Sequence, residues 1–375
     1  MAGHRRASYH PMPMIAARRR PWPPLFAVLA AVALLLPRLL PAQVPTPAAP
    51  TPKAAAEAQA AVERPLLWRI ELPTPSYLFG TIHLPDERVT ELPPVVAETM
   101  ERCDALYTEL PMDMAQLLKQ AGRMQLAEGE SLKGLLGDEL YGEVAAYVQQ
   151  KGVSMALLDR MQPWAAGTQI GMLDQMKEMA SKQPLDMLIY QRAKRAGKTV
   201  GGLETVDEQV AVFADMTVAE QRTYVRDALA NVKSEEAAGK KPTEELLKLY
   251  LKGDETAIEQ KVMEFPLTDA KLKKRLMKRL VDDRNVAMAD RIVRRLQEKP
   301  EAVQVFAVGA AHYPGKMGVL ELLRQRGYRL TRIELAVDDA ARAAEAAAVD
   351  AVIADREREL QRLRARRQTV GAGAK

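Results

Sequence analysis

The sequence of 375 residues has little of the residue types that most often supply cross-links and catalysis. It contains a single cysteine, Cys103, so no disulfide can form within the chain and stability must come from a hydrophobic core. Aromatic residues make up 5% of the chain, and histidines number four. A nucleophilic thiol needs a base and an exposed, electropositive setting. Cys103 instead sits at the end of a predicted helix, and we expect a buried structural thiol.

Several catalytic signatures are also absent. The sequence has no Gly-x-x-x-x-Gly-Lys-Ser/Thr loop, no Gly-x-Ser-x-Gly elbow and no His-Glu-x-x-His helix. The first absence argues against a P-loop nucleotide hydrolase, and the second against a serine hydrolase of the elbow type. The third excludes a zincin-type protease.

Positive charge is scarce outside the N-terminus, although the formal net charge is +5. Residues 1–42 hold six of the 54 basic residues and no acidic residue. The other 48 basic residues face 49 acidic ones, so residues 43–375 carry a charge of −1. Proteins that bind nucleic acid through phosphate contacts need a basic surface. We therefore expect no nucleic-acid partner.

The N-terminal segment has the pattern of an export signal. Three arginines, Arg18 to Arg20, precede a 12-residue apolar run at 25–36, which suits a signal peptide and is short for a membrane span. We predict a signal peptide at 1–42 with cleavage near Ala42, followed by a Pro- and Ala-rich linker at 43–63. The alternative is an uncleaved signal anchor, the only route to membrane anchoring that the sequence offers. Either case predicts a periplasmic or cell-surface protein of bacterial type.

The remaining sequence alternates strand and helix patterns and predicts a mixed α/β fold. One domain is expected over 64–336, with a large helical insertion at about 113–196, and a charged helix and tail at 337–375. The insertion is rich in methionine, which fits core packing better than an adaptable binding groove. Strands are expected at 66–72, 76–79, 105–109, 197–203, 302–308 and 328–334, and helices at 92–100, 206–299 and 315–326.

Two histidines remain once the export segment is set aside, and they stand in matching contexts. His83 and His312 each follow an apolar strand in a Gly-x-x-His motif and precede an apolar residue and a proline. A helix, a strand and a glutamate come after each histidine, Glu109 in the first half and Glu334 in the second. This duplication predicts two pseudo-symmetric β-α-β halves that share one sheet.

Strand ends are where such residues would act. Ligands of open α/β sheets gather at the carboxyl ends of the strands, and glycine there permits close backbone approach. We expect His83 and His312 to converge on one divalent metal ion or one water molecule. Glu109 and Glu204, which also follow strands, would complete a metal shell or act as general base. Glu204 could instead cap the helix that follows it, although glutamate is not a favoured N-cap.

These motifs together resemble the TraB/GumN (TraB/PrgY/GumN) family, which is related to the TIKI metalloproteases and more distantly to erythromycin-esterase-like and ChaN-like proteins. The resemblance implies a mixed α/β fold with a hydrolytic site at His83, Glu109, Arg284 and His312, with Glu204 as an additional member. The similarity covers roughly residues 64–336 and is carried by Tyr77–Leu84, Glu109, Gly197–Thr205, Gln209, Arg284–Asn285 and Val308–Gly315.

The function expected from residues and resemblance is that of an exported, metal-dependent hydrolase, peptidase-like in its action. His83, Glu109, Glu204 and His312 would hold the metal, which could be Mn, Co or Zn. Arg284 would stabilise an oxyanion or hold a substrate carboxylate, unless it only pairs with Asp282, Asp283 or another acid. The substrate would be a peptide or a small molecule. The alternatives are a non-catalytic periplasmic protein that sequesters a peptide or haem, and a metal-free, esterase-like hydrolase.

Overall fold

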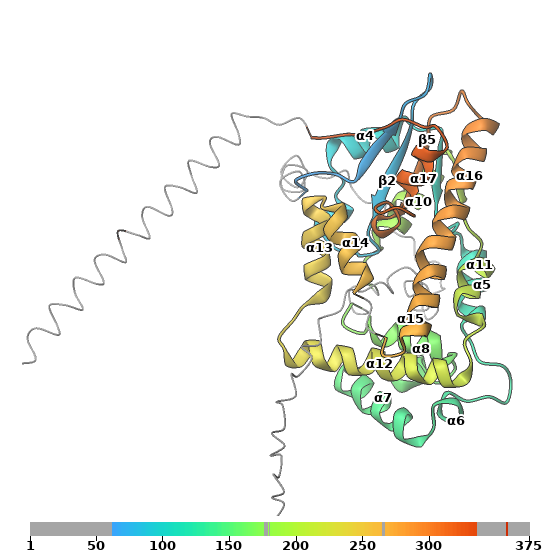
Figure 1. Ribbon diagram of the computed structural model, residues 1–375, viewed down its shortest axis with the longest axis vertical. Helices are drawn as coiled ribbons and strands as arrows, with labels where there is room; N and C mark the ends of the chain where they lie inside the picture. The colour runs from blue at the N-terminus through green and yellow to red at the C-terminus, as the bar shows by residue number, and fades with distance from the viewer. Residues whose placement is uncertain (1–61, 176–178, 180, 265–266, 336–357, 359–375) are drawn as a thin grey trace, which may run out of the picture. The chain divides into compact units, whose positions relative to one another are not determined.

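The computed structural model describes residues 62–175, 179, 181–264, 267–335 and 358 (Figure 1). The predicted signal segment 1–42, the linker up to residue 61, and the predicted C-terminal helix and tail, Arg358 apart, lie outside the described residues. The chain divides into two compact units, Met1–Ile333 and Glu334–Lys375. The fold below is that of the first unit. Among the described residues, no helix combines the length and the hydrophobicity that crossing a membrane would require.

The fold is mixed α/β, as the sequence predicts, and its sheet has six strands in the order β4-β3-β5-β2-β1-β6. Strand β1 is antiparallel to both of its neighbours, and the other pairs are parallel. All residues of β3 and β5 are buried, as is usual for parallel strands covered on both faces. The strands are β1 (Leu67–Ile70), β2 (Ser76–Thr81), β3 (Ala105–Thr108), β4 (Thr199–Gly202), β5 (Gln304–Gly309) and β6 (Leu330–Arg332).

The two central strands carry the two Gly-x-x-His motifs. β2 and β5 pair in parallel with Thr81 opposite Gly309, so both motifs leave the sheet at the same edge. Strand β2 is two residues longer than expected and includes Gly80, which approaches the chain near Leu66 closely. A Cβ atom on Gly80 would lie 2.8 Å from Cβ of Leu66. The pseudo-symmetry of the two halves stays a prediction.

Helices occupy the segments between the strands, including the region predicted to be helical at 113–196. Several begin at capping residues, and Thr205 and Thr217 form complete capping boxes. The helices are α3 (Glu87–Thr90), α4 (Pro94–Arg102), α5 (Met114–Arg123), α6 (Leu132–Leu136), α7 (Asp138–Gln150), η2 (Met155–Leu157), α8 (Pro163–Ile170), α10 (Leu185–Arg195), α11 (Val206–Ala214), α12 (Val218–Ala237), α13 (Pro242–Lys252), α14 (Glu255–Met263), α15 (Ala270–Met277), the π-helical turn η3 (Lys278–Asp283), α16 (Arg284–Glu298), η4 (Ala310–His312) and α17 (Val319–Gln325).

Two hydrophobic clusters stabilise this unit. The first surrounds the sheet and includes Cys103, which is buried as expected. The second lies among α6, α7, α8 and α12, which Figure 1 shows at the end of the unit away from the sheet. Five methionines of the predicted helical insertion are buried, which fits core packing: Met124, Met161, Met172, Met179 and Met187. Ala311, the residue before His312, packs against both clusters, so the second histidine motif lies where they meet.

Candidate active site

Four neighbouring strands bring the predicted site residues to one edge of the sheet. Glu109 follows β3 directly, Glu204 lies two residues after β4, and the histidines follow β2 and β5. The Nε2 atom of His83 is 3.8 Å from Oε1 of Glu109, and the Nε2 atom of His312 is 3.9 Å from the same oxygen. All five predicted residues, Arg284 included, are buried. The structure therefore brings them together, as expected for parallel strands whose carboxyl ends share an edge.

Gly309 allows this convergence because it has no side chain. A Cβ atom at Gly309 would lie 2.9 Å from Oε1 of Glu109, 3.3 Å from Nε2 of His83 and 3.6 Å from Cδ2 of His312. The backbone N–H of Gly309 donates a hydrogen bond of 2.8 Å to Oε1 of Glu109. Both rings and the carboxylate thus lie close to one backbone position, and a side chain there would displace the Glu109 carboxylate.

The orientation of His83 is set by Asp186, which the sequence analysis did not single out. Asp186 lies in the first turn of α10, and its Oδ2 atom is 2.6 Å from Nδ1 of His83. Its Oδ1 atom accepts a hydrogen bond of 2.5 Å from the Thr81 hydroxyl. Because an ionised carboxylate only accepts hydrogen bonds, Nδ1 of His83 must be the donor. The Nε2 atom is buried and has no hydrogen-bond partner among the described residues, so it is the atom aimed at the shared point.

His312 is oriented in the same way by an amide. The side chain of Asn285, near the start of α16, donates from Nδ2 to the carbonyl oxygen of Met317, at 2.8 Å. Its Oδ1 atom therefore faces Nδ1 of His312, at 2.6 Å, and Nδ1 must carry the proton. The lone pair of the neutral ring is then on Nε2, directed towards Glu109. Two different side chains thus fix a proton on Nδ1 of both histidines and leave Nε2 as the nitrogen that a metal ion could bind, which is the arrangement usual for metal-binding imidazoles.

Arg284 connects the two glutamates and does not pair with Asp282 or Asp283. Its Nε and Nη2 atoms donate to the two oxygens of Glu204, at 2.9 and 2.7 Å, and Nη2 also donates to Oε2 of Glu109, at 2.7 Å. The remaining Nη1 atom donates to the carbonyl oxygen of Leu280 in the π-helical turn η3. Gln209 adds a hydrogen bond of 3.1 Å to Glu204. Both oxygens of Glu204 are therefore occupied by the guanidinium fork.

Burial and neighbouring charges shift the pKa values of the three converging groups in different directions. Burial alone would lower the pKa of His83, but the Asp186 carboxylate outweighs it and raises the pKa to about 9. Burial, reinforced by the charge of Arg284, lowers the pKa of His312 to about 3. Burial would raise the pKa of Glu109, but Arg284 and the two histidines overcome it and lower the pKa to about 2. Near pH 7, in the absence of a metal ion, Glu109 is thus anionic, His312 neutral and His83 cationic, so a metal ion would have to displace a proton from Nε2 of His83.

The donor atoms are of the types that bind divalent cations, but they lie farther apart than the ligands of a bound ion would. Imidazole nitrogen with carboxylate oxygen is a donor set that suits Zn²⁺ and other first-row ions. Ligands at about 2.0–2.1 Å in a tetrahedral shell lie about 3.4 Å apart, which is closer than the separations of 3.8 and 3.9 Å measured here. Within the part of the chain that the structure describes, no group of three or more His, Cys, Asp or Glu side chains is assembled as a metal shell. The unpartnered Nε2 atom of His83 is the strongest sign of an intended ligand.

The residues that the sequence analysis missed act through the predicted ones. One feature of the sequence could have pointed to Asp186: it is the only acidic residue in the predominantly apolar stretch Leu185–Tyr190. A buried acid in such a stretch needs a partner. Asn285 and Gln209 belong to the segments that carry the family resemblance, but their roles depend on contacts 27 and 100 residues distant along the chain, to His312 and Glu109.

The fold and this site define a class of protein: a mixed α/β protein with two histidines and a glutamate that meet at the carboxyl edge of a mainly parallel sheet. A profile of the TraB/PrgY/gumN family matches residues 66–332, and the chain belongs to this family.

Curated relatives of the chain are metalloproteases. It is 27% identical over 310 residues to metalloprotease TIKI2 of Danio rerio, and 25% identical over 307 residues to metalloprotease TIKI1 of Homo sapiens. A metalloprotease TIKI homolog of Amphimedon queenslandica is 23% identical over 319 residues. These alignments cover 70%, 70% and 73% of this chain and 60%, 61% and 62% of the relatives, so the chain spans about three fifths of their length. No solved structure matches the chain.

Proposed function

We propose that this protein is an exported, metal-dependent peptidase whose reacting centre lies between His83, Glu109 and His312. One observation carries the proposal: two imidazole Nε2 atoms, each oriented by a partner at Nδ1, converge on one buried carboxylate oxygen. A satisfied turn histidine would not leave a buried Nε2 without a partner. The metalloprotease names of the relatives support a divalent ion and a peptide substrate for this chain as well.

In this proposal the residues divide into ligands and positioning groups. His83, His312 and Glu109 would hold the cation, which supplies Lewis-acid chemistry that polarises a carbonyl group and activates water. Asp186 and Asn285 hold the rings in the required tautomer. Glu204 was predicted as a further ligand, but the Arg284 fork occupies both of its oxygens, which favours a positioning role. Arg284 in turn fixes Glu109 and keeps it anionic.

Export is part of the proposal and rests on the sequence alone. The arginine-rich start, the apolar run at 25–36 and the Pro-rich segment after it are the features of a secreted or anchored bacterial protein. Fractionation of expressing cells, with N-terminal sequencing of the recovered protein, separates a cleaved signal from an anchor.

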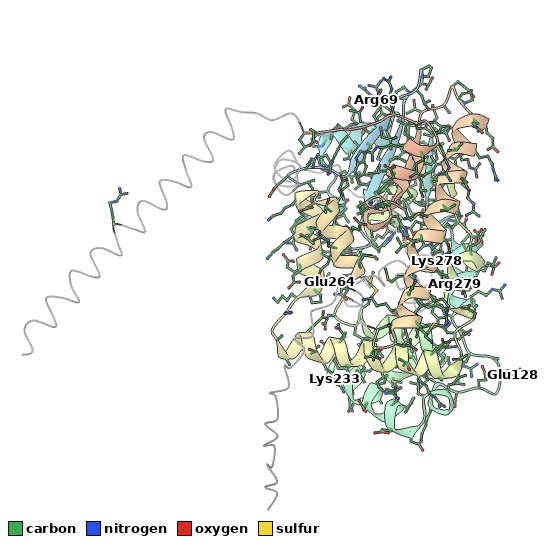
Figure 2. All side chains as sticks on the ribbon, in the orientation of Figure 1. Arg69, Glu128, Lys233, Glu264, Lys278 and Arg279 are labelled. Atoms are coloured by element: carbon green, nitrogen blue, oxygen red, sulfur yellow. The ribbon has the colours of Figure 1, made fainter. Side chains whose placement is uncertain are left out.

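The deciding experiment measures bound metal and hydrolysis in the same preparations of the full chain. After dialysis, elemental analysis should find Mn, Co or Zn in the wild type. The double variant His83→Ala/His312→Ala should lose the metal and the cleavage of a fluorogenic peptide library. Lys233→Ala, exposed on α12 (Figure 2), is the matched control and should retain both.

Other results would favour the rival functions. Equal metal content and equal cleavage in the double variant contradict the proposal. Cleavage that survives a chelator indicates a metal-free hydrolase, and peptide or haem binding without cleavage indicates a sequestering protein.

A further inference from the structure

A cavity lies beside the first histidine motif and outside the cluster of site residues. Its volume is about 420 Å³, within the range usual for ligand pockets. One wall is formed by Leu84 and Pro85, and the others by α8, α12, α13 and the chain between α8 and α10. Figure 1 shows α12 at the end of the unit away from the sheet and α13 between α12 and the level of the sheet.

The loop that carries His83 is also the wall of this cavity. Leu84 and Pro85 follow His83 directly in the chain. The carbonyl oxygen of Leu84 accepts a hydrogen bond of 3.2 Å from the backbone N–H of Leu185, the residue before Asp186. The cavity wall is therefore tied to both members of the His83–Asp186 pair, and a ligand in the cavity would lie against the loop that presents His83.

Two amide side chains in the cavity wall have unused hydrogen-bonding capacity. Asn231, on α12, has a buried Nδ2 atom with no partner in the described part of the chain. Gln175 donates from Nε2 to the hydroxyl of Thr243, at 2.5 Å, and its buried Oε1 atom likewise has no partner among the residues described. Buried polar atoms are nearly always paired, because an unpaired one costs stability. One free donor and one free acceptor in the same cavity complement a peptide group, which offers one C=O and one N–H.

Charge does not define the ligand of this cavity. The lining has five acidic residues and three basic ones, and Lys151, just outside it, pairs with two of the acids. Four of the acidic lining residues are paired with a basic residue. Arg88 pairs with Asp86 and Glu244, and Lys151 pairs with Asp174 and Glu236. Lys240 and Lys241 stand in no ion pair among the described residues, but solvent reaches both. The buried lining groups without a partner there are neutral amides, and they favour a neutral partner such as a polypeptide main chain.

We propose that this cavity is the substrate cleft of the same site and that it binds the main chain of an extended peptide. Asn231 donates from Nδ2 to a backbone carbonyl oxygen, and Oε1 of Gln175 accepts from a backbone N–H. Recognition of the main chain makes the enzyme tolerant of substrate sequence, because every residue offers the same amide groups. The inference rests on the proposed peptidase function for the identity of the ligand.

The test uses Asn231→Leu and Gln175→Leu, which remove the amides at nearly constant volume. The probe is a fluorescein-labelled library of random octapeptides, and its binding to the full chain is followed by fluorescence anisotropy with EDTA present so that no metal-dependent cleavage occurs. Each variant should bind about three- to tenfold more weakly, the equivalent of one lost hydrogen bond. Thermal melting of Asn231→Leu should be unchanged or higher, since a buried amide nitrogen without a partner has been removed. Gln175→Leu also loses the hydrogen bond to Thr243 and should melt slightly lower.

Gln120→Leu is the matched control, because Gln120 also has a buried, unpartnered amide nitrogen but does not line the cavity. It should leave peptide affinity unchanged. A wild type that does not bind the library, full affinity in both cavity variants, or an equal loss in the control would overturn the proposal. Metal content and cleavage are measured separately. If they are absent while the cavity variants still lose affinity, the peptidase function fails and the peptide cleft stands.

Discussion

At the scale of single residues, the chemistry of the site depends on what each histidine meets at its second nitrogen. Nδ1 of His83 meets a carboxylate, whose charge raises the pKa of that ring. Nδ1 of His312 meets a neutral amide, so burial lowers the pKa of that ring. Glu109 is fixed from both sides, by the N–H of Gly309 and by Arg284. The positions of these partners give each ring one orientation, and that orientation decides which nitrogen reaches the shared point.

Asp186→Asn should separate the charge of Asp186 from its shape. With the carboxylate replaced, burial dominates and the pKa of His83 in the metal-free protein should fall below its ordinary value of 6.5. Metal affinity should decrease about 10- to 100-fold, as is usual when an outer partner of a ligand histidine is lost. NMR titration of the ring and competition with a coloured chelator measure the two effects.

Thr81→Val is the control for that change, because it removes a hydrogen bond to Asp186 but leaves the negative charge. A smaller loss of affinity is expected. Metal affinity in Asp186→Asn within twofold of the wild type would contradict the positioning role.

At the scale of elements, the site depends on strand pairing and on the turns that end strands. The register that places Thr81 opposite Gly309 brings the two motifs to one level. The turn η4 then directs His312 back towards Glu109. The π-helical turn η3 precedes Arg284, and the carbonyl oxygen of Leu280 in this turn accepts a hydrogen bond from Nη1 of Arg284. Such turns often occur at functional sites, because they redirect one side chain without ending a helix.

Gly309→Ala tests how closely β5 approaches the site. The added methyl group would lie 2.9 Å from Oε1 of Glu109, so the carboxylate must move and metal affinity should fall about tenfold or more. Gly142→Ala, in α7 with no atom within 4 Å of the new Cβ, should keep full affinity and gain about 0.5–1 kcal/mol of stability. Isothermal titration with Mn²⁺, together with thermal melting, compares the two. Equal affinity in both variants would show that Gly309 is merely a convenient turn residue.

At the scale of the described unit, elements far apart in the sequence are joined by polar contacts as well as by packing. Arg88, in α3, binds Asp86 and reaches Glu244 of α13, 156 residues further along the chain. This contact connects the segment after the first histidine motif to the helices that line the cavity. The buried pairs around Arg284 connect the ends of β3 and β4 to α16 in the same way.

Arg88→Met should reveal this connection as a pH-dependent loss of stability. Hydrogen bonds from Arg88 lower the pKa of Asp86 and of Glu244 below their ordinary values of 3.8 and 4.5. Lowered carboxyl pKa values contribute stability above the ordinary values, and this contribution is lost as the pH falls through the lowered ones. At pH 7 the variant should lose about 1 kcal/mol, since Arg88 is partly exposed, and the difference should shrink below pH 4.

Urea unfolding at pH 7 and at pH 3 measures that difference. The control is Arg102→Met, which removes an exposed pair with Glu98 within one helix and should cost only a few tenths of a kcal/mol. A loss for Arg88→Met that is the same at both pH values would mean that its packing, and not its charge, stabilises the unit.

The sequence by itself determined the alternation of strands and helices, the duplicated Gly-x-x-His motifs and the glutamate after the third strand. These are local patterns, because side-chain periodicity and glycine placement act over a few residues. It also predicted that His83, Glu109 and His312 would meet, since parallel strands end at a common edge, and the family resemblance added Arg284. It did not reveal that β5 lies between β2 and β3, or that Arg284 would pair with Glu204.

Only the tertiary structure decided the partners of the two rings. Asp186 and Asn285 come from helices α10 and α16, and their contacts to the histidines span 103 and 27 residues. Such contacts leave no periodic trace in the sequence, because they depend on how helices pack against the sheet. Those contacts fix the tautomers, leave Nε2 of His83 unpartnered and thereby make two ordinary turn histidines into a candidate reacting centre.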